Sequence, residues 1–61
     1  MPYITIQMLE GRSVEQKREL VDVFTKEMSR ICKVDPSAIH IIIHDLPKHN
    51  LAKAGKLVSD K

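Results

Sequence analysis

Two stretches of the chain alternate between apolar and other side chains. Over residues 2–9 one set of alternate positions is Ile4, Ile6 and Met8, and the other set is Tyr3, Thr5 and Gln7. Residues 39–45 repeat the pattern, with Ile39, Ile41 and Ile43 on one face and His40, Ile42 and His44 on the other. A period of two, rich in β-branched residues, predicts a strand in each stretch. Gly11 ends the first strand, and Pro47 ends the second.

Between these strands the apolar residues recur at helical spacing. They include Leu20, Val21, Val23, Phe24, Met28 and Ile31, and charged residues take the opposite side. Ser13 is a good N-cap residue, and Gln16 three positions later completes a capping box. The pattern therefore predicts a helix from about Val14 to Cys32. Asp35-Pro36 then predicts a turn or a short capped helical turn.

Strand, helix and strand in this order define a βαβ unit of the α/β (α+β) class, with parallel strands and a right-handed crossover. We expect one domain over residues 1–61, ending in a short hairpin or turn around Gly55. A single helix covers one face of the sheet, whereas parallel sheets are normally covered on both. The second face is a mixture of polar and apolar residues. We therefore expect another subunit, and a site shared between subunits, on that face.

The small size of the chain also favours oligomerisation. A chain of 61 residues buries only about 60% of its unfolded surface, so its own core is marginal. Proteins of this size usually rely on disulfides, a metal or oligomerisation. Cys32 is the only cysteine, which excludes a disulfide within the chain and favours a reducing compartment.

Charge and hydropathy narrow the range of partners. Ten basic and eight acidic residues give a net charge of only +2, and the single Tyr and single Phe provide no stacking platform. This balance argues against nucleic acid as a partner. No apolar run approaches the roughly 20 residues of a membrane span, and the amino terminus lacks the regions of a signal peptide. We therefore expect a cytoplasmic protein without a membrane partner.

Pro2 is the first candidate for chemistry. Once Met1 is removed, its nitrogen is a secondary amine that accepts a proton, unlike that of any internal proline. A base works best when its pKa lies near the working pH, and burial or nearby positive charge lowers the pKa of an amine towards that range. The alternative is that Pro2 only starts an edge strand, where its missing N–H matters little.

A metal site built from the histidines is not expected. His40 and His44 share a strand face, but four residues at about 3.3 Å separate them by about 13 Å. Zinc needs its nitrogen ligands about 2 Å away, so both histidines cannot bind one ion. His49 could pair only with His44, which leaves the ligand set incomplete.

The opening and closing segments of the chain resemble a known family. Pro2-Tyr3-Ile4-Thr5-Ile6, Met8-Leu9-Glu10-Gly11-Arg12-Ser13 and Glu15-Gln16-Lys17, with the closing Ala54-Gly55-Lys56-Leu57-Val58-Ser59-Asp60, resemble the 4-oxalocrotonate tautomerase (2-hydroxymuconate tautomerase) family. The likeness includes the register between the proline and the arginine. It covers the whole chain without an obvious insertion.

This resemblance implies a function. Family members are small βαβ subunits, most often hexamers, whose active sites borrow residues from neighbouring subunits. The proline nitrogen moves a proton on an enol or activated carbon, and no metal or organic cofactor takes part. Pro2 matches this base. Arg12 matches an arginine that binds a substrate carboxylate, and its planar, charged guanidinium suits this task. Without the resemblance to the family, the preferred interpretation of Arg12 would be a solvated charge in a loop. The implied substrate is a small enolic or 2-oxo acid, such as a 2-hydroxymuconate-like dienol.

The sequence departs from the family pattern at two substrate-binding positions. His40 stands where many members have a second arginine, which polarises the substrate carbonyl, and Leu51 stands where many have an aromatic wall. Leu51 still keeps the pocket apolar. The two changes, and retention of Met1, would favour an oligomeric protein of this fold with weak or vestigial activity. A dehalogenase or hydratase relative would need a carboxylate to activate water, and no acidic residue lies between Asp45 and Asp60.

Overall fold

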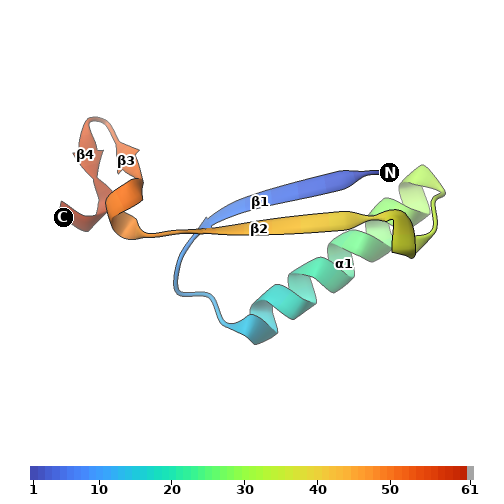
Figure 1. Cartoon of the computed structure of the whole chain (residues 1–61). Helices are drawn as coiled ribbons and strands as arrows, with labels where there is room; N and C mark the ends of the chain where they lie inside the picture. The colour runs from blue at the N-terminus through green and yellow to red at the C-terminus, as the bar shows by residue number, and fades with distance from the viewer. Residues whose placement is uncertain (61) are drawn as a thin grey trace.

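The computed structural model describes residues 1–60 and contains the expected βαβ unit (Figure 1). Strand β1 spans Tyr3–Leu9, helix α1 spans Val14–Cys32, and strand β2 spans His40–Leu46. β1 and β2 pair in parallel, from Tyr3 opposite His40 to Leu9 opposite Leu46, and α1 lies along one side of the pair. The predicted parallel pairing and the predicted helix bounds are confirmed.

The second strand lies one residue further along the chain than the predicted range of 39–45. Ile39 does not join the sheet, because its N–H donates to the carbonyl oxygen of Pro36 at 3.1 Å and closes the short helix η1 (Pro36–Ala38). The first strand likewise begins at Tyr3. The carbonyl oxygen of Pro2 nevertheless accepts a hydrogen bond from the N–H of His40 at 3.1 Å, so the ladder continues to Pro2.

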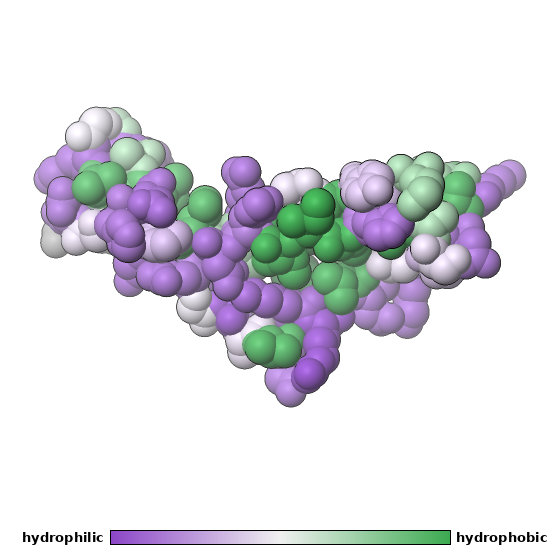
Figure 2. Space-filling model, in the orientation of Figure 1, coloured by the Kyte–Doolittle hydropathy of each residue, from purple (hydrophilic) through white to green (hydrophobic). Residues whose placement is uncertain are grey.

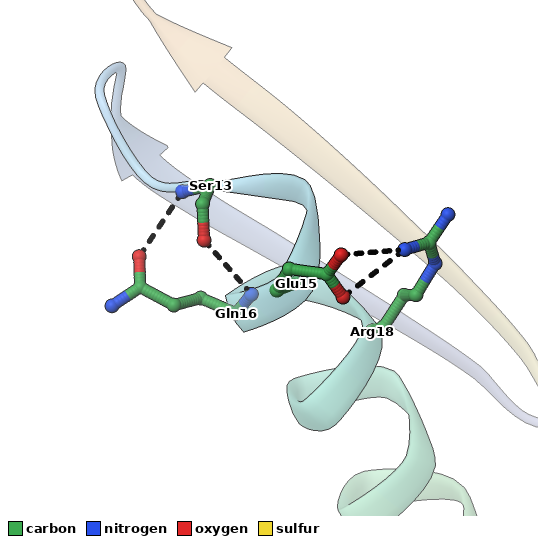
Figure 3. A network of polar contacts seen from close by, with 4 residues as sticks. All are labelled: Ser13, Glu15, Gln16 and Arg18. Atoms are coloured by element: carbon green, nitrogen blue, oxygen red, sulfur yellow. Dashed lines mark hydrogen bonds and ion pairs between the residues drawn. The ribbon is translucent and has the colours of Figure 1, made fainter.

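The start of α1 is fixed by local hydrogen bonds (Figure 3). The N–H of Ser13 donates to Oε1 of Gln16 at 3.0 Å, and the N–H of Gln16 donates to Oγ of Ser13 at 3.1 Å. This is the predicted capping box, which satisfies two of the backbone donors that a helix start leaves free. Arg18 and Glu15 form a surface ion pair at 3.1 Å on the same turn.

One ion pair connects the helix to the sheet. Nζ of Lys17, in the first turns of α1, lies 2.5 Å from Oδ2 of Asp45, near the end of β2. Both side chains are partly exposed, so this pair contributes little free energy by itself. It does join two elements at the end of the sheet where the loop of Gly11 leads into α1.

The C-terminal segment forms a separate small unit. Helix η2 (Lys48–Asn50) precedes a two-residue hairpin of β3 (Ala52–Lys53) and β4 (Lys56–Leu57), and helix η3 (Val58–Asp60) follows. Ala54 and Gly55 both have positive φ, 54° and 80°, as a tight hairpin turn requires. The predicted turn at Gly55 is confirmed. In Figure 1 this hairpin and the N-terminus lie at opposite ends of the molecule.

No residue among 1–60 is fully buried. The strand faces alternate as predicted, with Ile4, Ile6, Met8, Ile41 and Ile43 half-buried. The opposite face leaves Tyr3 62% and Ile42 45% exposed, and on α1 Val23 and Phe24 remain 46% and 38% exposed. Figure 2 shows apolar side chains open to the surface over the βαβ unit. A single chain therefore leaves part of its apolar side-chain surface exposed to solvent.

Asp35 caps the short helix η1. Oδ1 of Asp35 accepts hydrogen bonds from the hydroxyl of Ser37 at 2.7 Å and from the Ser37 N–H at 2.8 Å. Both bonds favour the charged carboxylate, and the bond from the Ser37 hydroxyl has the larger effect. They hold the pKa of Asp35 below its ordinary value of 3.8.

Asp35→Ala is expected to lower the free energy of unfolding most clearly above pH 3.8, the ordinary Asp35 value. A lowered folded pKa gives stability that is fully present above the unfolded value and is lost as the pH falls through the folded one. The difference in the free energy of unfolding between Asp35→Ala and the wild type should therefore narrow in acid. Denaturant unfolding over a pH series measures this difference. Glu19→Ala removes another exposed carboxylate, one that forms no ion pair within residues 1–60, and serves as the control. An equal difference at every pH would contradict the capping role.

Candidate active site

Pro2 lies at the amino end of β1, directly beside β2. It is half-buried, and its carbonyl oxygen accepts the hydrogen bond from the His40 N–H. Met1 precedes it and is 77% exposed. The amino end of the chain is therefore accessible, while the proline itself is held against the sheet.

His40 lies opposite Tyr3 in the register, and their side chains stack. The ring centroids are 5.0 Å apart and the ring planes are inclined by 20°. Both residues are exposed on the face of the sheet that α1 does not cover. The sequence indicated His40 as a candidate and placed Tyr3 on an open face, but the contact between them was not predicted, because it depends on the register of the two strands.

Arg12 lies beyond the other end of β1, in the loop where Gly11 takes a φ of 115°. Within residues 1–60, Arg18 and Arg30 are each paired with a glutamate, whereas Arg12 has no carboxylate within ion-pair distance. Arg12 borders a mostly apolar cavity of about 350 Å³ that also contains the carboxylate of Glu19. The other lining residues are Met8, Gln16, Glu19, Leu20, Val23 and Phe24. A charged fork beside an apolar hollow suits an organic anion.

Leu51 belongs to the C-terminal segment. It is half-buried, and its carbonyl oxygen accepts a hydrogen bond from the N–H of Val58 at 2.8 Å, which closes the segment on itself. Leu51 does not line the cavity beside Arg12.

One chain does not bring the four candidates together. β1 has seven residues, and at about 3.3 Å per residue its ends lie about 20 Å apart. Pro2 and His40 share the amino end of the sheet, while Arg12 and Leu51 follow the carboxyl ends of the two strands. A small substrate cannot contact Pro2 and Arg12 of the same chain.

The described residues contain neither a metal cluster nor a spanning helix. Within residues 1–60 no three His, Cys, Asp or Glu side chains lie together as metal ligands would. No helix in the same range combines the length and the apolar character needed to cross a membrane.

Comparisons with known proteins identify the family. The tautomerase enzyme family matches residues 2–61. The 2-hydroxymuconate tautomerase of Bacillus subtilis is 42% identical over 60 residues, which are 98% of this chain and 97% of that protein. The chain belongs to the tautomerase family, and it is an isomerase.

Solved structures agree with this assignment. A 4-oxalocrotonate tautomerase homologue superposes with a TM-score of 0.97 at 34% identity, covering 100% of this chain and 97% of the other. A heterohexamer 4-oxalocrotonate tautomerase from Chloroflexus aurantiacus gives a TM-score of 0.88 at 30% identity, covering 98% and 97%. The α+β fold with one long helix and a parallel strand pair is therefore the fold of this family.

Proposed function

We propose that this protein is a cofactor-independent tautomerase acting on a small enolic or 2-oxo carboxylic acid, such as a 2-hydroxymuconate-like dienol, with Pro2 as general base. The observation that carries the proposal is the family match, which begins at Pro2 and leaves Met1 outside. Proline at position two is a small residue, of the kind that usually permits removal of the initiator Met. Without Met1 the Pro2 nitrogen is a free secondary amine.

The proposed reaction needs one nitrogen and no external reagent. The Pro2 amine takes the hydroxyl proton of the enol, and the oxygen electrons form the carbonyl as the conjugated double bonds shift. The electron pair of the last double bond then takes the proton from the Pro2 ammonium and forms a new C–H bond. The amine is regenerated, and the product is a conjugated ketone.

Three residues serve this proton transfer in our proposal. Arg12 binds a substrate carboxylate, because its guanidinium is free of ion pairs among residues 1–60 and borders an apolar hollow. His40 donates a hydrogen bond to the carbonyl oxygen on which charge develops, a form of stabilisation that often supplies a large catalytic effect. Leu51 of a neighbouring subunit contributes an apolar wall that keeps water from the amine.

We also propose that the working form is an oligomer of this single tautomerase-like domain, most simply a homohexamer in the cytoplasm. The separation of Pro2 from Arg12 by the length of β1 supports it, since subunits must meet to complete the site. The half-covered sheet and the absence of a fully buried residue in 1–60 support it too. A relative of the same fold is a heterohexamer, and the lone thiol of Cys32 fits a reducing compartment.

The decisive experiment combines intact mass with an assay. Protein whose mass shows that Met1 is absent should ketonise mono- and dicarboxylic dienols, followed by the change in ultraviolet absorbance. Protein with the same mass and assembly but no turnover on either dienol would favour the vestigial alternative that the His40 and Leu51 positions raised.

Arg12→Ala is expected to raise KM and lower kcat/KM for carboxylate substrates by about ten- to a hundredfold, because a charge-assisted hydrogen bond contributes about 1.5–3 kcal/mol. Arg18→Ala is the matched control, since Arg18 is an exposed arginine already paired with Glu15. Steady-state kinetics on both variants tests the assignment. A change below about twofold for Arg12→Ala would leave Arg12 as a solvated loop charge.

His40→Arg is expected to increase kcat/KM for a dicarboxylic dienol. A guanidinium carries a permanent charge and five N–H donors, so it stabilises a developing oxyanion better than an imidazole. His44→Arg, on the same face four residues along β2, adds the same charge away from Pro2 and is the control. An equal gain from both variants would indicate a general charge effect and would place His40 away from the carbonyl.

A further inference from the structure

We propose that Tyr3 is a positioning residue that fixes the orientation of the His40 imidazole for the substrate carbonyl. The inference rests on the role proposed above for His40. It adds a second residue, Tyr3, which has no part in the proposed function. It starts from the stacked contact between the two rings, at 5.0 Å between centroids and 20° between planes.

Within residues 1–60 this stack is the only side-chain contact of His40 with another ring or polar group. Both rings are on the open face of the sheet, with Tyr3 62% exposed, and within residues 1–60 no hydrogen bond or ion pair to the imidazole is formed. An exposed histidine of this kind samples several rotamers. Stacking at 5.0 Å falls within the range of favourable aromatic pairs. Within its own subunit, Tyr3 therefore supplies the contact that selects one plane for the His40 ring.

The plane of the ring sets the direction of the hydrogen bond. The N–H groups of an imidazole lie in its plane, and the neutral ring has only one of them. An arginine has five N–H donors, so it can still donate a hydrogen bond after its side chain turns. A neutral histidine has one N–H donor and loses the hydrogen bond when its ring turns. Because this chain has histidine there, an orienting neighbour becomes part of the site. The backbone of His40 is already held beside Pro2, because the His40 N–H donates a hydrogen bond to the Pro2 carbonyl oxygen.

Tyr3→Leu is the direct test, because leucine keeps an apolar side chain but removes the flat ring. We expect kcat/KM to fall about two- to tenfold, which corresponds to the stabilisation that an aromatic pair contributes. The loss should be mainly in kcat. Tyr3→Phe keeps the ring and should retain wild-type kinetics. A loss in Tyr3→Phe equal to that in Tyr3→Leu would overturn the proposal, since the hydroxyl and not the stack would then matter.

A double-mutant cycle tests whether Tyr3 acts through His40. In a His40→Ala background, which is itself expected to lower kcat/KM, Tyr3→Leu should have no further effect. Gln7→Leu is the matched control, because Gln7 lies on the same face opposite His44, and it should behave as wild type. An equal effect of Tyr3→Leu with and without His40 would reduce Tyr3 to a structural residue.

Proton NMR of the imidazole gives a readout that does not depend on turnover. The His40 ring protons should move when Tyr3→Leu removes the ring current and should stay in place in Tyr3→Phe. Full activity in Tyr3→Leu, combined with a loss in His40→Ala, would overturn this inference alone. Full activity in His40→Ala would overturn the proposed role of His40, and this inference with it. Light scattering confirms that all variants assemble alike.

Discussion

An alanine inserted between Met1 and Pro2 is expected to abolish turnover while leaving the fold and the assembly intact. After Met1 is removed, this chain begins with alanine, and the proline nitrogen becomes part of a planar amide. Its lone pair is then delocalised and cannot accept a proton. General base catalysis contributes about a hundred- to ten-thousandfold, so kcat should fall by at least about a hundredfold. The added residue extends from an exposed end, where Met1 is 77% accessible.

Pro2→Ala provides the matched control for this insertion. It keeps a free amine, now primary, at nearly the same place, so measurable activity should remain. Intact mass must show the expected first residue in each protein, and circular dichroism with light scattering must show an unchanged fold and mass. Undiminished turnover in the alanine-inserted chain would rule out Pro2 as the base.

The elements of the fold could be predicted because local interactions determine them. The bounds of α1 follow from the capping box of Ser13 and Gln16 and from the helical spacing of its apolar residues, all visible in the sequence. The turn at Gly55 follows from the tolerance of glycine for positive φ. The one-residue error at the start of β2 is also local, since Ile39 alternates like a strand residue but gives its N–H to Pro36.

The arrangement around the candidate site could not be predicted from spacing alone. The stack of Tyr3 on His40 joins residues separated by the whole of α1, and it exists because the strands pair in that register. The ion pair of Lys17 and Asp45 depends on the same crossover. Pro2 and Arg12 were identified from a motif, which carries no information on distance. Their placement at opposite ends of β1 supports the proposal of a site shared between subunits, because the distance along the strand separates them.

Ile42→Asp is expected to break the assembly and, with it, the activity. Ile42 lies at the middle of β2 on the face that α1 leaves open, and it is 45% exposed in the single chain. If a second subunit covers this face, a carboxylate there loses water without gaining a partner, at a cost of several kcal/mol per ion. Symmetry repeats the cost in every subunit. Light scattering at micromolar concentration should therefore show a mass well below that of the wild-type oligomer.

Activity should follow assembly in this variant. Pro2 and Arg12 of one chain are separated by about 20 Å along β1, so a dissociated subunit cannot hold a substrate between them. The core of the free chain is also marginal, and the melting temperature should fall together with the mass. Ile42→Val is the matched control, because it keeps an apolar, β-branched side chain and should leave mass, melting temperature and kcat/KM close to wild type. If Ile42→Asp retains the mass and the turnover of the wild type, the open face of the sheet is not the interface, and the shared site must be built from a different surface of the subunit.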